Sequence, residues 1–323
     1  MSLSGFDDRF DDLRDYILKI TEWIWEGRGI DLISDYYAED CPVKTPAAAF
    51  CGVEKVILGT LETLQEFPDR TLLGEDVIDS EDEPGTYYSS HRIFSHMTHL
   101  GEGTFGAPTG IRAEVMTIAD CLCRGNRIVD EWLVRDQAGL ALQLGHSPET
   151  MGRNLADKAK LPAPEALVDR WRGPEGDLDI DTLGPIAVRY RDLWQHSRIE
   201  QLRNGYDRAI ETKVPGARTL RGHDDLERFW FAYKGAFPSG EFRIHHWIDR
   251  EDTGAARRVA FRWSLETTHQ GNGAFGSASG APVVLLGITH AELRGDTVVR
   301  EWHMLDEIAI HAQIAQHRQQ EAS

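Results

Sequence analysis

The sequence predicts an α+β protein of two tandem domains, each with N-terminal helices packed on a curved antiparallel β-sheet. Two of the supporting observations are repeats at an offset of 170 residues: "RGNRIVDEWLVRD" (124–136) resembles "RGDTVVREWHMLD" (294–306), and "THLGEGTFGAPTG" (98–110) resembles "THQGNGAFGSASG" (268–280). In each half, helical periodicity precedes strand-like alternation. In addition, 323 residues are many for a single hydrophobic core.

The repeat extends toward the start of each copy. Gly52 matches Gly222 at the same offset, and the register slips by about one residue near Tyr36 or Tyr37 and Tyr206. Solenoid repeats have periods of about 20–50 residues, much shorter than this one. The sequence therefore indicates a duplicated domain.

The expected domains span 8–158 and 185–318. Between them, 159–184 is rich in proline, glycine and acidic residues, which is typical of a linker. Ser147 precedes Pro148 and an early glutamate, a pattern that predicts a helix over 148–159 at the end of the first copy.

Each copy is expected to form two helices and then at least three strands. The expected helices are 11–27 and 53–67 in the first copy, and 186–197 and 223–237 in the second. The expected strands are 87–100, 112–123 and 127–136, and then 257–269, 282–293 and 297–306. Gly-Asn at 125–126 and Gly-Asp at 295–296 mark hairpin tips, where positive φ angles are needed.

The composition is that of an ordinary globular protein, with a formal net charge of −18. Such acidity argues against nucleic acid and anionic membranes as partners, because both require a basic surface. No apolar run approaches the roughly 20 residues that span a bilayer. The N-terminus lacks the pattern of a signal peptide, and the four cysteines suggest free thiols in a cytoplasmic protein. Neither they nor the histidines have the spacing of a familiar metal site, so no metal is expected.

The repeated motifs resemble those of the SnoaL-like polyketide cyclase and predicted ester cyclase group. The first copy carries the fuller set: Thr98-His99, Phe105-Gly106, Pro108-Thr109-Gly110, Glu131-Trp132, Asp136 and Gln143-Leu144-Gly145. The second copy keeps Thr268-His269, Phe275-Gly276, Glu301-Trp302 and Asp306. The resemblance covers about 130 residues per copy and implies the nuclear-transport-factor-2-like fold, a cone-shaped α+β barrel.

The resemblance also implies roles for particular side chains. Cyclases of this group use a pocket aspartate on the last strand as acid and base in an intramolecular aldol closure, and that role falls on Asp136 and Asp306. Polar residues on the preceding strand are expected at Asp120 and His290. These two positions depend on the register, because a shift of one residue turns a side chain to the other face of the sheet.

The residues support a similar hypothesis independently. Trp302, Met304 and Asp306 alternate and so share one face of a strand. A carboxylate at the end of an apolar face is desolvated, which raises its pKa toward the range useful for proton transfer. His290 could then donate a hydrogen bond to an enolate oxygen.

The first copy repeats the arrangement with Trp132, Val134 and Asp136. There Asp120 would be a poor donor unless it stayed protonated. The chemistry therefore favours the second copy, whereas the quality of the motifs favours the first.

Structural interpretations compete with these roles. Asp136 and Asp306 each precede a helical stretch and could be N-caps. Trp132 and Trp302 could be pocket wall or core. His99 and His269 could contact a ligand or only anchor the glycine-rich loops that they begin.

Three functions are compatible with the sequence. The first is a cofactor-independent cyclase or isomerase that transfers a proton on a small hydrophobic carbonyl compound. The second is a non-catalytic module that binds a small ligand or assists assembly. The third is an epoxide-hydrolase-like enzyme, which would need an Asp-Arg-Asp group, although Arg135 should face away from Asp136. The duplication also suggests an internal pseudo-dimer of the two domains and leaves room for a homodimer.

Overall fold

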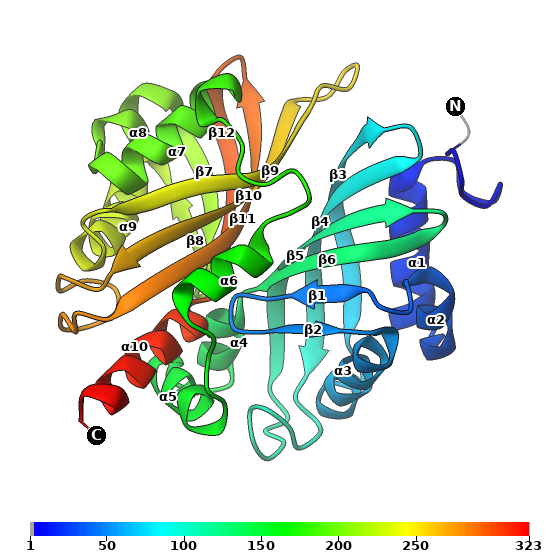
Figure 1. Ribbon diagram of the computed structural model, residues 1–323, viewed down its shortest axis with the longest axis horizontal. Helices are drawn as coiled ribbons and strands as arrows, with labels where there is room; N and C mark the ends of the chain where they lie inside the picture. Colours follow the sequence, from blue (N-terminus) through cyan, green and yellow to red (C-terminus); the bar gives the residue numbers. More distant parts are fainter. Residues whose placement is uncertain (1–2, 323) are drawn as a thin grey trace. The chain divides into compact units, whose positions relative to one another are not determined.

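The computed structural model describes residues 3–322 and confirms an α+β protein with two six-stranded sheets, each preceded by helices (Figure 1). The chain divides into two compact units. The first unit comprises Met1–Thr45 and Ala49–His146, and the second comprises Pro46–Ala48 and Ser147–Ser323.

In the first unit the strand order is β2-β1-β6-β5-β4-β3. Its strands are β1 (Pro42–Lys44), β2 (Ala49–Cys51), β3 (Thr71–Glu83), β4 (Thr86–Thr98), β5 (Arg112–Arg124) and β6 (Arg127–Arg135). Its helices are α1 (Leu13–Trp25), α2 (Ile33–Tyr36), α3 (Val53–Glu66) and α4 (Gln137–Gln143). All neighbouring strands are antiparallel except β1 and β6, which are parallel.

The second unit has the matching order β8-β7-β12-β11-β10-β9. Its strands are β7 (Tyr206–Val214), β8 (Arg218–Arg221), β9 (Gly240–Arg250), β10 (Arg257–Thr268), β11 (Pro282–Arg294) and β12 (Thr297–Leu305). Its helices are α5 (Pro148–Lys158), α6 (Pro164–Trp171), α7 (Pro185–His196), α8 (Glu200–Gly205), α9 (Gly222–Ala236) and α10 (Glu307–Glu321).

The expected helices and strands are confirmed with small shifts of their ends, and the strands β1, β2, β3, β7, β8 and β9 are additional. Gly125 and Asn126 have positive φ at the β5–β6 hairpin, as does Gly295 at the β11–β12 hairpin. Residues with positive φ match the twist of a tight hairpin. The Ser147 side chain caps α5 as predicted.

The strand registers show that the two units are copies of one another at the residue level. Ile93 pairs with Thr117 in the first unit, and Trp263 pairs with Gly287 in the second, so the offset of 170 holds across both sheets. Near the start of each copy, Tyr37 bridges to Ile128 while Tyr206 pairs with Val298. Tyr37, rather than Tyr36, is therefore the counterpart of Tyr206.

The segment expected to be a linker is partly helical. Its helix α6 packs against β10 and β11 and buries Leu167, Val168 and Trp171. Immediately before it, α5 packs on α10, where Gly152 lies so close to His311 that a Cβ atom would clash. These contacts explain why both helices belong to the second unit.

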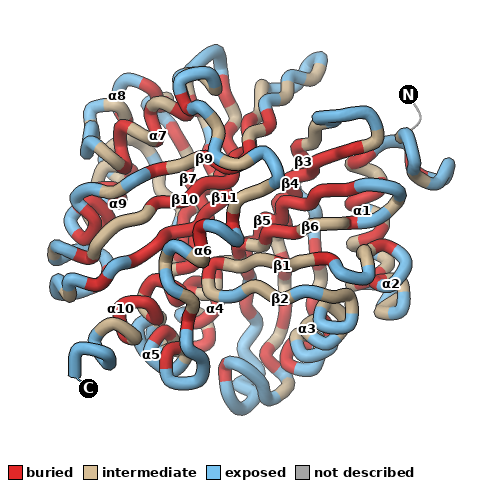
Figure 2. Tube along the Cα trace, in the orientation of Figure 1, coloured by how far each residue is buried: buried red, intermediate tan, exposed pale blue. Residues whose placement is uncertain are grey.

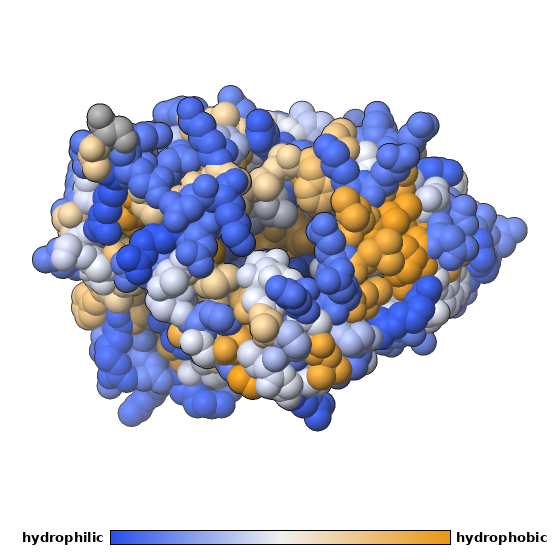
Figure 3. Space-filling model, turned by 90° about the horizontal axis from the view of Figure 1, so that it is seen from below, coloured by the Kyte–Doolittle hydropathy of each residue, from blue (hydrophilic) through white to orange (hydrophobic). Residues whose placement is uncertain are grey.

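One face of each sheet, which we call the inner face, is covered by α1 and α3 in the first unit and by α7 and α9 in the second. The strands are largely buried, whereas loops and outward helix surfaces are exposed (Figure 2). Figure 3 shows apolar residues gathered on part of one face of the molecule. Helix α3 exposes Leu58 and Leu61. Among residues 3–322, no helix is long and apolar enough to cross a membrane.

Candidate functional site

The first unit contains a cavity of about 280 Å³ between its helices and the inner face of its sheet. This volume is close to the lower end of the range of about 300–1,000 Å³ that is typical of small-molecule sites. Most of the lining is apolar; these side chains include Ile17, Ile20, Ile24, Trp25, Val43, Phe50, Leu72, Ile93 and Leu133. The site therefore suits a small, largely hydrophobic molecule.

Glu131 is the only carboxylate among the described residues that line this cavity. It lies on β6 and is 8% exposed. Burial raises the pKa of Glu131 to about 7, although a hydrogen bond from the Tyr37 hydroxyl and the positive charge of Arg135 both act to lower it. At neutral pH this carboxyl is divided between its two forms, which suits a group that takes up and returns a proton.

Two arginines also line the cavity. Arg70, just before β3, is 2% exposed, and its Nε and Nη2 atoms lie 3.4 and 3.3 Å from the Ser95 hydroxyl. Its guanidinium carbon lies 4.8 Å from the ring centroid of Trp25. Burial, together with the charge of Arg135, places the pKa of Arg70 well below its usual value. The cavity thus combines a hydrophobic wall with positive charge.

Two of the uncharged polar groups in the lining are His91 and Thr117. His91 on β4 is buried, and burial lowers its pKa to about 3, so the imidazole is neutral at physiological pH. Neither its Nε2 atom nor the Thr117 hydroxyl on β5 has a hydrogen-bond partner among the described residues. Buried polar groups without partners are rare, and in a cavity they are available to bind a ligand.

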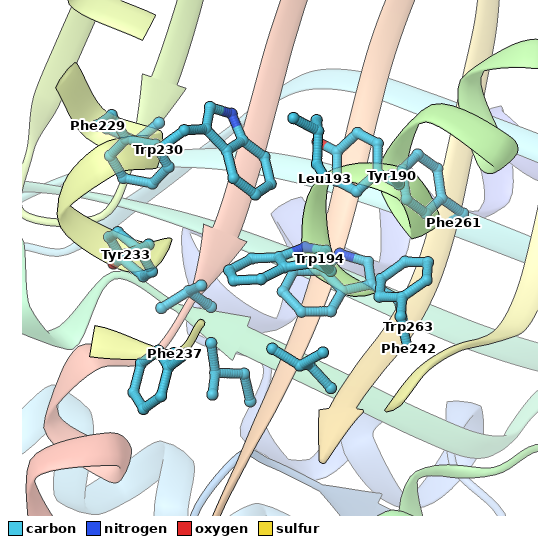
Figure 4. Close-up of a cluster of buried hydrophobic side chains, with 14 of the residues drawn as sticks. Tyr190, Leu193, Trp194, Phe229, Trp230, Tyr233, Phe237, Phe242, Phe261 and Trp263 are labelled. Atoms are coloured by element: carbon cyan, nitrogen blue, oxygen red, sulfur yellow. The ribbon is translucent and has the colours of Figure 1, made fainter. Parts of the chain in front are cut away.

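The interior of the second unit is filled with aromatic side chains (Figure 4). Trp194 packs against Trp230 with ring centroids 4.8 Å apart, and Tyr190 packs against Phe261 at the same distance. The His303 ring stacks on Trp263 at 5.2 Å. All five of these aromatic residues and the histidine are at most 1% exposed.

The difference between the units arises at equivalent positions. On α3 the cavity is lined by Gly59, Thr60 and Thr63, and the counterparts on α9 are the aromatic residues Phe229, Trp230 and Tyr233. On the strands, the substitutions follow the register described above: His91 corresponds to Phe261, Ile93 to Trp263, and Leu72 to Phe242. Larger side chains from α9, β9 and β10 therefore occupy the space that is open in the first unit.

The carboxylates expected to act in catalysis are found at helix starts. An Asp136 oxygen accepts a hydrogen bond of 2.8 Å from the Gly139 amide at the start of α4. An Asp306 oxygen accepts bonds of 2.9 and 3.3 Å from the amides of Ile308 and Ala309 in α10. The N-cap interpretation is confirmed for both.

The other residues expected to line the two cones lie on the outer faces of the sheets. In β6, Glu131, Leu133 and Arg135 line the cavity, so the alternate residues Trp132 and Val134 point away from it. Asp120 is opposite Trp132 and shares that outer face. The expected orientation therefore differs from the structure by one residue.

The second unit shows the same shift. Glu301, His303 and Leu305 face the helices, and the Tyr206 hydroxyl donates to a Glu301 oxygen over 2.8 Å. Trp302 and Met304 therefore face outward. His290 is opposite Trp302 on the outer face, away from the aromatic interior.

His99 and His269 anchor the glycine-rich loops. The Nδ1 atom of His99 lies 3.2 Å from the Thr109 hydroxyl, and that of His269 lies 2.9 Å from the Ser279 hydroxyl. Thr109 and Ser279 belong to the same loops, so each bond closes its own loop.

Sequence reasoning overlooked Glu131, Arg70 and His91 as cavity residues. A signal for Glu131 exists in the sequence, since Glu-Trp recurs in both copies, although the expected pocket residue of that pair was Trp132. Arg70 and His91 are not part of any repeated motif, and only the folded sheet brings them to the same cavity.

Residues 186–314 match the family model described as SnoaL-like polyketide cyclase. A comparison with curated proteins gave no match.

Several solved structures resemble part of the chain. IdmH from Streptomyces antibioticus is 22% identical over 41% of this chain and 97% of its own, with a TM-score of 0.36. A SnoaL-like polyketide cyclase from Agrobacterium tumefaciens is 16% identical over 41% of this chain and 98% of its own, with a TM-score of 0.34. An NTF2-like protein from Exiguobacterium is 20% identical over 38% of this chain and 98% of its own, with a TM-score of 0.30. The match to the SnoaL-like polyketide cyclase family model thus lies in the second unit, over residues 186–314.

Proposed function

We propose that the cavity of the first unit binds a small, largely hydrophobic carbonyl compound and that Glu131 transfers a proton on it. The observation that carries this proposal is a single buried carboxyl with a pKa of about 7 in an open apolar cavity. A general base works best when its pKa is close to the working pH. The match of residues 186–314, the equivalent region of the second unit, to the SnoaL-like polyketide cyclase family model supports the same class of reaction.

The chemistry requires a base and a stabiliser for negative charge. In its ionised form, Glu131 removes a proton from a carbon next to the carbonyl, and the electron pair moves to the carbonyl oxygen. The Arg135 guanidinium, whose charge already acts on Glu131, stabilises this enolate.

Protonated Glu131 then returns the proton in one of two ways. If it protonates another carbon, the product is an isomer. If the enolate carbon first attacks a second carbonyl of the same molecule, a carbon–carbon bond closes a ring, and the proton passes to the new alkoxide. Neither outcome changes the oxidation state of the compound overall.

The arrangement favours this reaction over epoxide hydrolysis. The epoxide mechanism considered from the sequence needs two carboxylates around an arginine, whereas Glu131 alone supplies a carboxylate among the described lining residues. Arg135 lines the cavity and Asp136 caps α4, so they do not act as one group.

Proton transfer can be measured before the natural substrate is known. The full chain is incubated in D₂O with 1-tetralone and acetophenone, and NMR follows the loss of the protons next to the carbonyl. We expect enzyme-dependent exchange in the wild type and its loss in Glu131→Gln, which has the same size but cannot act as a base.

The second unit provides a matched control. Glu301 is the counterpart of Glu131, and burial also raises its pKa to about 7, but it lies among the aromatic side chains. Glu301→Gln should exchange the protons at the wild-type rate. Equal loss in both variants, or normal exchange in Glu131→Gln, would contradict the proposal.

The same experiment separates catalysis from binding. If these ketones bind in the cavity without any exchange, the first unit is a binding module and the proton-transfer role of Glu131 is wrong. Calorimetry on the same samples distinguishes that outcome from a failure to bind.

A further inference from the structure

We infer that the ligand of the first unit's cavity carries an anionic group, most simply a carboxylate, and that Arg70 binds it. This inference deepens the proposed function, since it takes the same cavity as the ligand site. It concerns recognition of the ligand and does not depend on the proton transfer assigned to Glu131.

The first step of the argument is that Arg70 is buried without a counter-ion. Only 2% of the residue is exposed, and it makes no ion pair with any residue between 3 and 322. Its side-chain contacts are long hydrogen bonds to Ser95 and the face of the Trp25 ring. An arginine stays protonated in proteins, so its charge must be tolerated in this apolar setting.

The second step concerns the charges around Arg70. The charged group that acts on it is Arg135, a second cation lining the same cavity. Glu131 is the single carboxylate among the described lining residues, and its charge interacts with that of Arg135. The lining therefore has one more cation than anion, although the chain as a whole has a net charge of −18.

The third step is the comparison with the second unit. The counterpart of Arg70 is Gly240, and the counterpart of Arg135 is Leu305, which is part of the aromatic core. If the arginines were needed to hold the fold, the filled copy should also have them. Both cations are found only in the unit that has an open cavity. This distribution indicates that the two arginines serve the cavity and are not needed to maintain the fold.

An anionic group on the ligand would supply the counter-ion that the buried Arg70 guanidinium lacks. A guanidinium presents donors in a planar fork that matches a carboxylate, and such bonds are among the strongest in proteins. The remaining walls are mainly hydrophobic, which favours a single small anionic group on an aromatic or aliphatic body. In this arrangement Arg70 holds the anion, while Arg135 keeps the role proposed for it beside Glu131.

The test compares two probes of nearly equal size that differ in charge. Isothermal titration calorimetry on the full chain measures 2-naphthoate and 2-naphthamide. We expect the carboxylate to bind more tightly than the amide. Arg70→Met should weaken binding of the carboxylate by at least about tenfold and leave binding of the amide unchanged within about threefold.

Two further variants make the result specific. Arg112→Met removes an exposed arginine of β5 in the same unit and should leave both affinities unchanged. Arg70→Lys keeps the charge and should retain part of the preference for the carboxylate.

A stability measurement excludes a merely structural role. Without ligand, Arg70→Met should unfold at the same temperature as the wild type or a higher one, because the buried charge has no counter-ion. A clearly lower midpoint would show that Arg70 supports the fold, and this would overturn the inference.

The outcomes also separate this inference from the proposed function. If naphthamide and naphthoate bind equally and Arg70→Met affects both alike, the anion is wrong but the cavity remains a ligand site. If neither probe binds, while 1-tetralone still exchanges its protons, the inference fails and the proton-transfer proposal stands.

Discussion

Thr60 of α3 and Trp230 of α9 occupy equivalent positions in two copies of one fold, but Thr60 lines a cavity and Trp230 fills a core. Thr60 lines the open cavity of the first unit, whereas the Trp230 ring lies 4.8 Å from that of Trp194 in a filled interior. The first unit thus has room for a ligand at this place, whereas aromatic side chains occupy the matching region of the second. This contrast leads to several predictions.

Filling the cavity of the first unit should abolish ligand binding. Thr60→Trp introduces the residue that the second unit has at this position, and its ring would occupy the space between α3 and the sheet. We expect calorimetry to show no binding of 1-tetralone or 2-naphthoate, while circular dichroism shows an intact fold. Thr60→Ser, which barely changes the volume, should bind like the wild type; unchanged binding in Thr60→Trp would mean that ligands bind elsewhere.

Emptying the interior of the second unit should mainly reduce stability. Trp230 is 1% exposed and contacts several aromatic rings, so Trp230→Ala leaves a large void. We expect a loss of about 3–5 kcal/mol in the free energy of unfolding, measured with urea. Thr60→Ala, at the equivalent position beside an existing cavity, should cost less than about 1 kcal/mol. Similar costs at the two positions would contradict the difference in packing.

The proposed proton transfer should depend on pH through one ionisation. The pKa of Glu131 is about 7, mainly because the carboxyl is buried, with smaller effects from Tyr37, Arg135 and Asp130. The base form is the ionised one, so the exchange rate of 1-tetralone should rise between pH 6 and 8 and level off above that range. NMR exchange rates corrected for the buffer reaction check this, and a rate that falls over this interval would exclude Glu131 as the base.

The contribution of Glu301 to the free energy of unfolding should fall as the pH rises, whereas the exchange rate should increase. The folded-state pKa of Glu301 is about 7, above the value of an unfolded glutamate, so its contribution is fully present below about pH 4.3 and is lost as the pH rises through 7. Glu301→Gln should therefore lose less stability than the wild type between pH 5 and 8, as measured by urea unfolding at each pH. Parallel curves for the two proteins would show that this pKa is not raised.

The capping aspartates should matter for stability and not for proton transfer. Asp306→Ala removes the acceptor for two amides of α10 and should cost about 0.5–2 kcal/mol in the free energy of unfolding. Asp306→Asn keeps an acceptor and should cost less. Both variants should exchange 1-tetralone at the wild-type rate; a lost reaction in folded Asp306→Asn would return this residue to a catalytic role.

The duplication and the order of helices and strands could be predicted because they depend on local patterns. The hairpin tips at Gly125 and Gly295 and the cap at Ser147 follow from backbone preferences of a few residues. The strands β3 and β9 were harder to predict, since polar residues interrupt their alternation. Such strands depend on pairing with β4 and β10, the more regularly buried strands that follow them in the chain.

The sequence by itself determined that one α+β fold occurs twice, because the same motifs and periodicities recur in both halves of the chain. Only the tertiary structure decided which face of β6 and β12 is the inner one. In β12, Leu305 and Met304 are both buried although they point to opposite faces, so hydrophobicity alone cannot assign the face. The tertiary structure also decided which copy has a cavity, since that volume depends on side chains from a helix and several strands that meet only after folding.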